Sequence, residues 1–286
     1  MAFKIAYLKS RDVKYDSVTD AFVEFAKERG VEFEFETHEI GYIFPADSEW
    51  LKKYDAIIVQ GAPYNRERIE DIARNLGLVT KCAFKEDFQH LSGSNQIFVT
   101  CISPKGLGEF RTTLKIGREA VESARHCELE IERATRHAYE FAEKRRQDLT
   151  LLYVTVSSVV TQIWDKVVSE INEDYPSVKL SFENGFEHTF ATMRGDRQYD
   201  VVLMVYSIFD ALSQATDKDL NIEVGASPIA YLGDTAVGMY ATENPAAYSP
   251  FFDALAISKM LENSFDLPAL AKDWKEQISK VYCKTE

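Results

Sequence analysis

The sequence predicts an α/β protein built about a mixed or parallel sheet. The region from residue 131 to residue 214 shows this most clearly, because helical and strand patterns alternate along it. Residues 149–156 and 199–206 are short apolar runs rich in β-branched side chains, a composition typical of strands that are covered on both faces. Between them, apolar side chains recur at helical spacing over residues 159–171. This repeated strand–helix–strand order favours a doubly wound sheet with right-handed crossovers.

The amino-terminal part alternates strands with short helices. Residues 3–8 form the expected first strand, and the apolar face of residues 18–26 predicts a helix that Gly30 ends. Residues 31–37 (VEFEFET) alternate apolar and charged side chains, which is the pattern of a strand with one solvated face. A short helix, a buried strand, a longer helix and a further strand are expected at residues 48–53, 55–59, 66–75 and 96–102.

The periodicity is lost between residues 103 and 127, so this stretch is expected to be an arm or a loop. Helical spacing returns over residues 131–144. The helix that begins near residue 159 is expected to end at Tyr175-Pro176, because proline lacks a backbone donor. A strand at 178–182, short segments at 229–232 and 237–241, and helices at 252–265 and 268–282 complete the prediction.

Composition restricts the classes of partner. The net charge of −13 argues against a nucleic-acid backbone or an anionic membrane as the main partner. The four cysteines are scattered without metal-type spacing, which indicates reduced thiols and a cytoplasmic protein. No run approaches the roughly 18 apolar residues that a membrane-spanning helix needs. Composition therefore argues against nucleic acid and membrane as main partners, although a local basic patch could still bind a small anion.

Three segments carry a resemblance to a known family. They read ERATRHAYEFAEKRR, WDKVVSEINEDYPSVKL and YDVVLMVYSIFDALS, in this order, between residues 132 and 213. They resemble the isocitrate/3-isopropylmalate dehydrogenases, which are β-decarboxylating hydroxyacid dehydrogenases. The resemblance is good over this region and weaker, though still in order, across most of the remaining chain.

The resemblance implies a two-domain α/β fold with a doubly wound sheet and a dimerisation arm. The large domain is expected at residues 1–95 and 230–286, and the smaller domain at residues 96–229. The arm, at about residues 103–128, would clasp a second subunit. The implied assembly is a homodimer or a heteromer with a related subunit.

The resemblance also implies a ligand set. In this family, cations hold the substrate carboxylates, acidic groups hold Mg²⁺ or Mn²⁺, and the cofactor is NAD or NADP. Candidate positions in this chain are Arg74, Lys81, Lys105 and Arg111 for the substrate, Asp210 and Glu187 for the metal, and Asp12, Glu243 and Asn244 for the cofactor.

Several parts of the family's chemistry are missing from the sequence. The catalytic lysine is expected on the strand before Trp164, but no lysine occurs between residues 147 and 163. The proton-donating tyrosine is expected at residues 106–110, which contain none, and Gln214 replaces the second acid of the metal motif. Apolar and amide groups cannot carry protons or replace a charged metal ligand. No residue is therefore assigned a catalytic role.

Three functions remain open. The chain is a diverged family member that binds a small anionic carboxylate or phosphorylated metabolite without decarboxylating dehydrogenase chemistry, either alone or as a supporting subunit. Alternatively, it is an enzyme with altered chemistry on a small organic acid. The third alternative is an active NAD(P)- and Mg-dependent oxidoreductase of 2-hydroxy acids.

Overall fold

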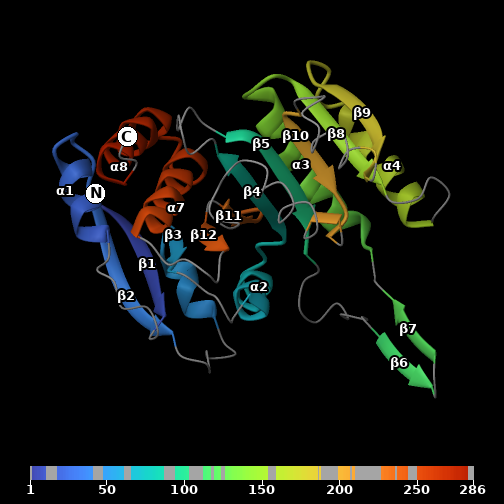
Figure 1. The fold of residues 1–286 in the computed structure, drawn as a ribbon, viewed down its shortest axis with the longest axis horizontal. Helices are drawn as coiled ribbons and strands as arrows, with labels where there is room; N and C mark the ends of the chain where they lie inside the picture. The colour runs from blue at the N-terminus through green and yellow to red at the C-terminus, as the bar shows by residue number, and fades with distance from the viewer. Residues whose placement is uncertain are drawn as a thin grey trace.

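The computed structural model shows one large mixed sheet with helices on both faces (Figure 1). A separate two-stranded hairpin projects from the body. The residues that it describes are 2–10, 18–40, 48–60, 66–86, 94–102, 112–116, 119–123, 126–153, 159–185, 187, 199–206, 208–209, 227–235, 237–243 and 250–282.

The main sheet has ten strands in the order β2-β1-β3-β12-β11-β4-β5-β10-β8-β9. Neighbouring strands are parallel toward both edges of the sheet, whereas β12, β11, β4 and β5 pair antiparallel in its centre. The strands are β1 Phe3–Ser10, β2 Phe33–Ile40, β3 Ala56–Val59, β4 Thr80–Glu86, β5 Ser94–Cys101, β8 Asp148–Tyr153, β9 Lys179–Asn184, β10 Val201–Met204, β11 Ser227–Leu232 and β12 Gly238–Glu243.

Strand alternation divides the core into two clusters, one on each face of the sheet. On β1, Ile5 and Tyr7 belong to one cluster, and Ala6 and Leu8 belong to the other. The first face is covered by α1, α3, α4, α7 and α8, and the second by α2 and η1. The helices are α1 Thr19–Lys27, the 3₁₀ helix η1 Glu49–Lys53, α2 Arg66–Asn75, α3 Glu128–Glu143, α4 Val159–Asn172, α7 Pro250–Asn263 and α8 Pro268–Tyr282.

The two ends of the described chain lie side by side. Helix α1 packs next to α8 (Figure 1), and the ring centroids of Phe22 and Trp274 are 5.2 Å apart. Gly30 has a φ of +78° and follows the end of α1, as the sequence predicts. No helix in the described ranges has the length and the apolar composition that a bilayer crossing requires.

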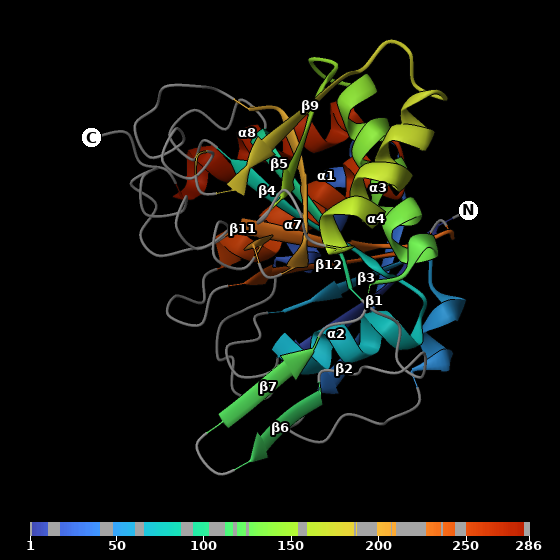
Figure 2. The ribbon, with the colours of Figure 1, turned by 90° about the vertical axis from the view of Figure 1, so that its right-hand side faces the viewer.

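The predicted arm contains a β-hairpin. Strands β6 (Thr112–Ile116) and β7 (Glu119–Ser123) pair antiparallel as a sheet of their own. Figures 1 and 2 both show this hairpin standing away from the main body. A hairpin in this position agrees with the arm that the sequence predicts, while contact with a second subunit remains a prediction.

Strand β4 is the principal element that the sequence prediction missed. Its sequence, TKCAFKE, contains two lysines and one glutamate and lacks the apolar run of the other central strands. It nevertheless pairs with β5 and β11, so the main sheet continues without a break across residue 95. The division into two domains near that residue therefore stays a prediction.

A side-chain hydrogen bond ties α3 to β4. Nδ1 of His137 lies 2.9 Å from Oγ1 of Thr80. Burial lowers the pKa of His137 below its ordinary value, although the carboxylates of Glu140 and Asp234 act in the opposite direction. The histidine is therefore neutral in the folded protein at neutral pH.

We predict that His137 makes the free energy of unfolding depend on pH. The pKa of His137 is lower in the folded than in the unfolded protein. Its contribution to the free energy of unfolding is therefore fully present above about pH 6.5 and is lost as the pH falls through the folded-state pKa. His137→Asn should therefore reduce the loss of stability between pH 7.5 and pH 5, as measured by urea unfolding. Thr80→Val removes the same hydrogen bond but keeps the titrating group, so this control should retain the wild-type slope. An unchanged slope in His137→Asn contradicts the prediction.

Candidate functional site

Glu70 on α2 accepts hydrogen bonds from three side chains that come from different parts of the chain. Its Oε1 lies 3.1 Å from Nζ of Lys81 and 2.7 Å from the hydroxyl of Tyr206. Its Oε2 lies 3.1 Å from Nη2 of Arg74, one helical turn further along α2. We name these four residues, Glu70, Arg74, Lys81 and Tyr206, the Glu70 cluster.

Lys81 is the most deeply buried member of the cluster, with a fully inaccessible side chain. It lies near the start of β4, and three aromatic rings surround its ammonium group. The distances from Nζ to the ring centroids are 5.7 Å for Tyr206, 5.3 Å for Phe209 and 5.7 Å for Tyr231. A buried ammonium group requires a counter-charge and hydrogen bonds, and the 4% exposed side chain of Glu70 supplies both.

Arg74 is one of two members of the cluster, with Tyr206, that are partly exposed to solvent. Its side chain is 13% exposed, and its Nη1 donates to Oδ1 of Asp71 at 3.2 Å. Asp71 is itself 40% exposed. Gly77, with a φ of +76°, ends the helix directly after this turn, so Arg74 also lies where a cation interacts favourably with the helix dipole. The guanidinium therefore bridges one buried carboxylate and one accessible carboxylate.

The Glu70 cluster lies at the carboxyl ends of two parallel strands. Tyr206 and Phe209 follow β10, and Lys81 pairs with Thr100 near the end of β5. Ligands of α/β sheets bind at this edge, beyond the carboxyl ends of the strands. The cluster therefore occupies a position that suits a small-molecule site.

The structure brings together the two predicted substrate-binding cations that it describes. Arg74 and Lys81 both contact Glu70, a residue that the sequence analysis missed. Glu70 precedes Arg74 by four residues on a helix, but this spacing is too common to have identified it from the sequence. Lys85 was also missed. It is 1% exposed, with its Nζ 5.7 Å from the ring centroid of Phe98.

The remaining predicted residues are only partly described. Phe209 approaches Lys81, so the segment next to Asp210 reaches the Glu70 cluster, although Asp210 itself lies outside the described residues. Glu187 is exposed, and Glu243 is the last residue of β12. Asp12, Lys105, Arg111 and Asn244 also lie outside the described residues.

The described residues do not form a metal site. Within the described ranges, no three His, Cys, Asp or Glu side chains are grouped so that they could hold a metal ion. Glu70 is engaged by two cations and a hydroxyl group, which is an unfavourable environment for a metal ligand. The metal assignment to Asp210 and Glu187 therefore stays a prediction.

We predict that Glu70 and Lys81 are strongly coupled in stability. Glu70→Gln leaves a buried ammonium group without this counter-charge and should lower the free energy of unfolding by about 3 kcal/mol. The double variant Glu70→Gln/Lys81→Met should recover part of this loss, because neither charge is then buried. Urea unfolding of both single variants and the double variant measures the coupling.

A surface ion pair provides the matched control. Glu49 and Lys52 are 2.8 Å apart with side chains 62% and 52% exposed, so Glu49→Gln should change stability by at most about 0.5 kcal/mol. A double variant at the Glu70 cluster that is no more stable than Glu70→Gln contradicts the proposed coupling.

Sequence comparison relates part of the chain to 3-isopropylmalate dehydrogenases. No protein-family model matches. The enzyme of Synechococcus sp. (strain JA-3-3Ab) is 28% identical over 186 residues, which are 62% of this chain and 48% of that protein. The enzyme of Methylococcus capsulatus is 29% identical over 157 residues, which are 52% of this chain and 43% of that protein. The match thus spans about half the length of these relatives.

Solved structures match the fold of almost the whole chain. Isocitrate dehydrogenase from Methylococcus capsulatus superimposes with a TM-score of 0.74 at 17% identity, covering 97% of this chain and 91% of that chain. A β-decarboxylating dehydrogenase from Thermococcus kodakarensis gives a TM-score of 0.70 at 15% identity and covers 99% of both chains. The partial sequence matches and the shared fold together support a relationship of this chain to the isocitrate/3-isopropylmalate dehydrogenases.

Proposed function

We propose that this protein binds a small anionic carboxylate or phosphorylated metabolite at Arg74 and has lost decarboxylating dehydrogenase chemistry. The observation that carries the proposal is the junction of Arg74 and Lys81 at Glu70, at the carboxyl ends of β5 and β10. A guanidinium donates charge-assisted hydrogen bonds to carboxylate and phosphate oxygens. The protein acts as a non-catalytic binder or as the supporting subunit of a related partner.

The exposed side of Arg74 provides a route for the ligand. Its pairing with Asp71 lies at the surface, where an ion pair contributes at most about 1 kcal/mol. A ligand carboxylate replaces Asp71 at Nη1 at little cost, while Nη2 stays on the buried Glu70. Glu70 therefore fixes the orientation of the guanidinium, and Asp71 is the partner that exchanges.

Missing proton carriers support the loss of dehydrogenase chemistry. Strand β8, which precedes α4, reads DLTLLY and contains no lysine. No lysine occurs from residue 145 to residue 165, and the next one, Lys166, lies on α4. No tyrosine occurs at residues 106–110. Proton transfer by a positioned side chain typically contributes 10²–10⁴-fold to a rate. Two such losses remove most of the turnover that a dehydrogenase of this family requires.

We predict no detectable oxidation of 3-isopropylmalate or isocitrate. The purified full chain is incubated with each acid, NAD or NADP, and Mg²⁺ or Mn²⁺, and nicotinamide absorbance is followed. A 3-isopropylmalate dehydrogenase assayed in parallel is the positive control. Steady reduction of either cofactor at a rate that scales with protein concentration refutes the loss of chemistry and supports an active oxidoreductase instead.

We predict that Asp71 competes with the ligand for Arg74. In thermal-shift titrations with malate-type acids and inorganic phosphate, Arg74→Ala should abolish the ligand-induced rise in melting temperature. Asp71→Asn should tighten binding by up to about fivefold, because it removes an exposed carboxylate that competes for Nη1.

Arg136→Ala is the matched control for this experiment. Arg136 lies on α3 and pairs with Glu132 and Asp174 at the surface, so its removal should leave binding unchanged. An equal loss in Arg136→Ala and Arg74→Ala indicates a general charge effect and contradicts the proposed site. Wild-type protein that responds to none of these anions contradicts anion binding itself.

A further inference from the structure

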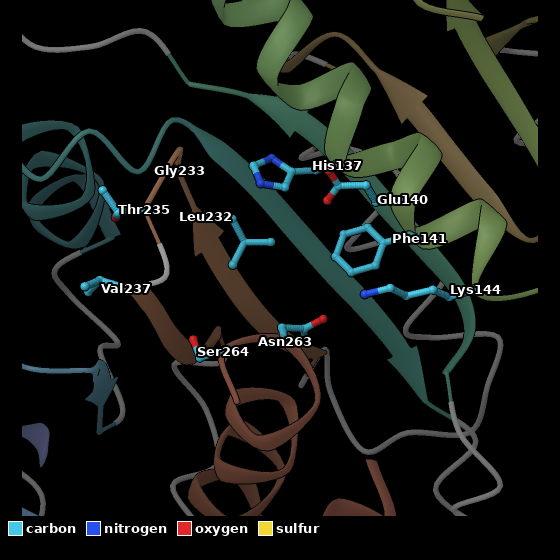
Figure 3. A pocket seen from close by; sticks show the side chains of 10 residues that line it. All are labelled: His137, Glu140, Phe141, Lys144, Leu232, Gly233, Thr235, Val237, Asn263 and Ser264. Carbon is cyan, nitrogen blue, oxygen red and sulfur yellow. The ribbon is translucent and has the colours of Figure 1, made fainter. Parts of the chain in front are cut away.

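A pocket of about 200 Å³ opens on the face of the sheet opposite the Glu70 cluster. Helix α3 covers β4, β5, β8 and β10, whereas α7 covers β3, β11 and β12. The pocket lies between α3 and the end of α7, next to the segment that joins β11 and β12 (Figure 3). Its lining residues are His137, Glu140, Phe141, Lys144, Leu232, Gly233, Thr235, Val237, Asn263 and Ser264.

The pocket contains one negative and one positive side chain from the same helix. Glu140 and Lys144 are four residues apart, the spacing and order that favour an ion pair on a helix. Among the ion pairs of the described residues, however, neither side chain has an oppositely charged partner within 4 Å. Figure 3 shows Lys144 extending from α3 over the pocket, toward the side that carries Asn263. Both residues are exposed to solvent, so two opposite charges border the pocket without pairing with each other.

The other polar groups add directional hydrogen bonding without adding charge. Nδ2 of Asn263 donates a hydrogen bond to the carbonyl of Lys259 at 2.7 Å. Its Oδ1 takes no part in this bond and can accept another one. Oγ of Ser264 lies 2.8 Å from the hydroxyl of Tyr240. His137 is neutral because burial lowers its pKa, and it is bound to Thr80. The pocket thus presents one anion and one cation, with no net charge.

The apolar part of the lining limits the size and character of a ligand. Phe141, Leu232 and Val237 are partly buried and supply hydrocarbon surface. The pocket is small, at about 200 Å³, which suits a compact ligand. A nucleotide does not fit, and a polyanion meets Glu140 as well as Lys144.

We propose that this pocket binds a small zwitterion, namely an α-amino acid with a short aliphatic side chain. Its ammonium group pairs with Glu140, and its carboxylate pairs with Lys144. Its side chain rests on Phe141, Leu232 and Val237. The two charges of an α-amino acid are close together, as are side chains one helical turn apart, whose Cβ atoms are about 5–6 Å apart.

Three related compounds test the requirement for both charges. L-Valine carries an ammonium and a carboxylate group, isobutylamine lacks the carboxylate, and isovalerate lacks the ammonium. Saturation-transfer NMR with the full chain at about 10 mM compound detects dissociation constants in the millimolar range. Valine should bind, and the two single-charge analogues should bind about two- to fivefold more weakly, because each loses one solvent-exposed ion pair.

Charge-removing variants locate the site. Glu140→Gln and Lys144→Gln should each weaken valine binding by about two- to fivefold, because both side chains are exposed to solvent. Glu143→Gln on the same helix and Lys272→Gln on α8 are exposed and do not line the pocket, so they should bind valine as the wild type does. Circular dichroism checks that all four variants are folded.

Several results overturn the proposal. Isovalerate that binds as tightly as valine indicates a simple anion site. Valine binding that survives both Glu140→Gln and Lys144→Gln places the amino acid elsewhere. No signal from valine, alanine or leucine means that the pocket takes no amino acid of this kind.

Discussion

The centre of this protein depends on the burial of the Lys81 ammonium group. A fully buried cation in the middle of a sheet is tolerated only with a counter-charge, and Glu70 supplies it at 3.1 Å. Glu70 lies on α2, and Tyr206, which donates to the same carboxylate, follows β10. One charge pair thus fixes a helix, a strand and a segment 136 residues from Glu70 in sequence. The geometry around Arg74 follows from this constraint, because Glu70 also orients its guanidinium.

Most of the fold could be predicted from the sequence because apolar residues that are buried on one face recur with the period of a helix or a strand. The helices predicted at 66–75 and 268–282 match α2 and α8 residue for residue. Apolar spacing, Pro268 and the charged faces all indicate the same helix boundaries. Strand β4 was missed for a physical reason. Its lysines at 81 and 85 are buried through partners and aromatic surroundings supplied by tertiary structure, and local pattern cannot show these.

The candidate site was predictable to a smaller extent. Family resemblance selected Arg74 and Lys81, and the structure brings them to one carboxylate. The sequence could not identify that carboxylate, because an acid four residues before an arginine is a common arrangement on exposed helices. The spacing also could not show that Glu70 reaches β4 as well as its own helix. This information depends on how α2 lies on the sheet.

The backbone contact between Gly77 and Gly233 joins the two faces of the molecule. A Cβ atom at Gly233 would lie 2.6 Å from the carbonyl oxygen of Gly77, so the turn after β11 rests directly on the turn that ends α2. Thr80 and Lys81, which follow on β4, point to opposite faces, one toward His137 and the other toward Glu70. A displacement of this shared turn would therefore move residues on both faces of the sheet at once.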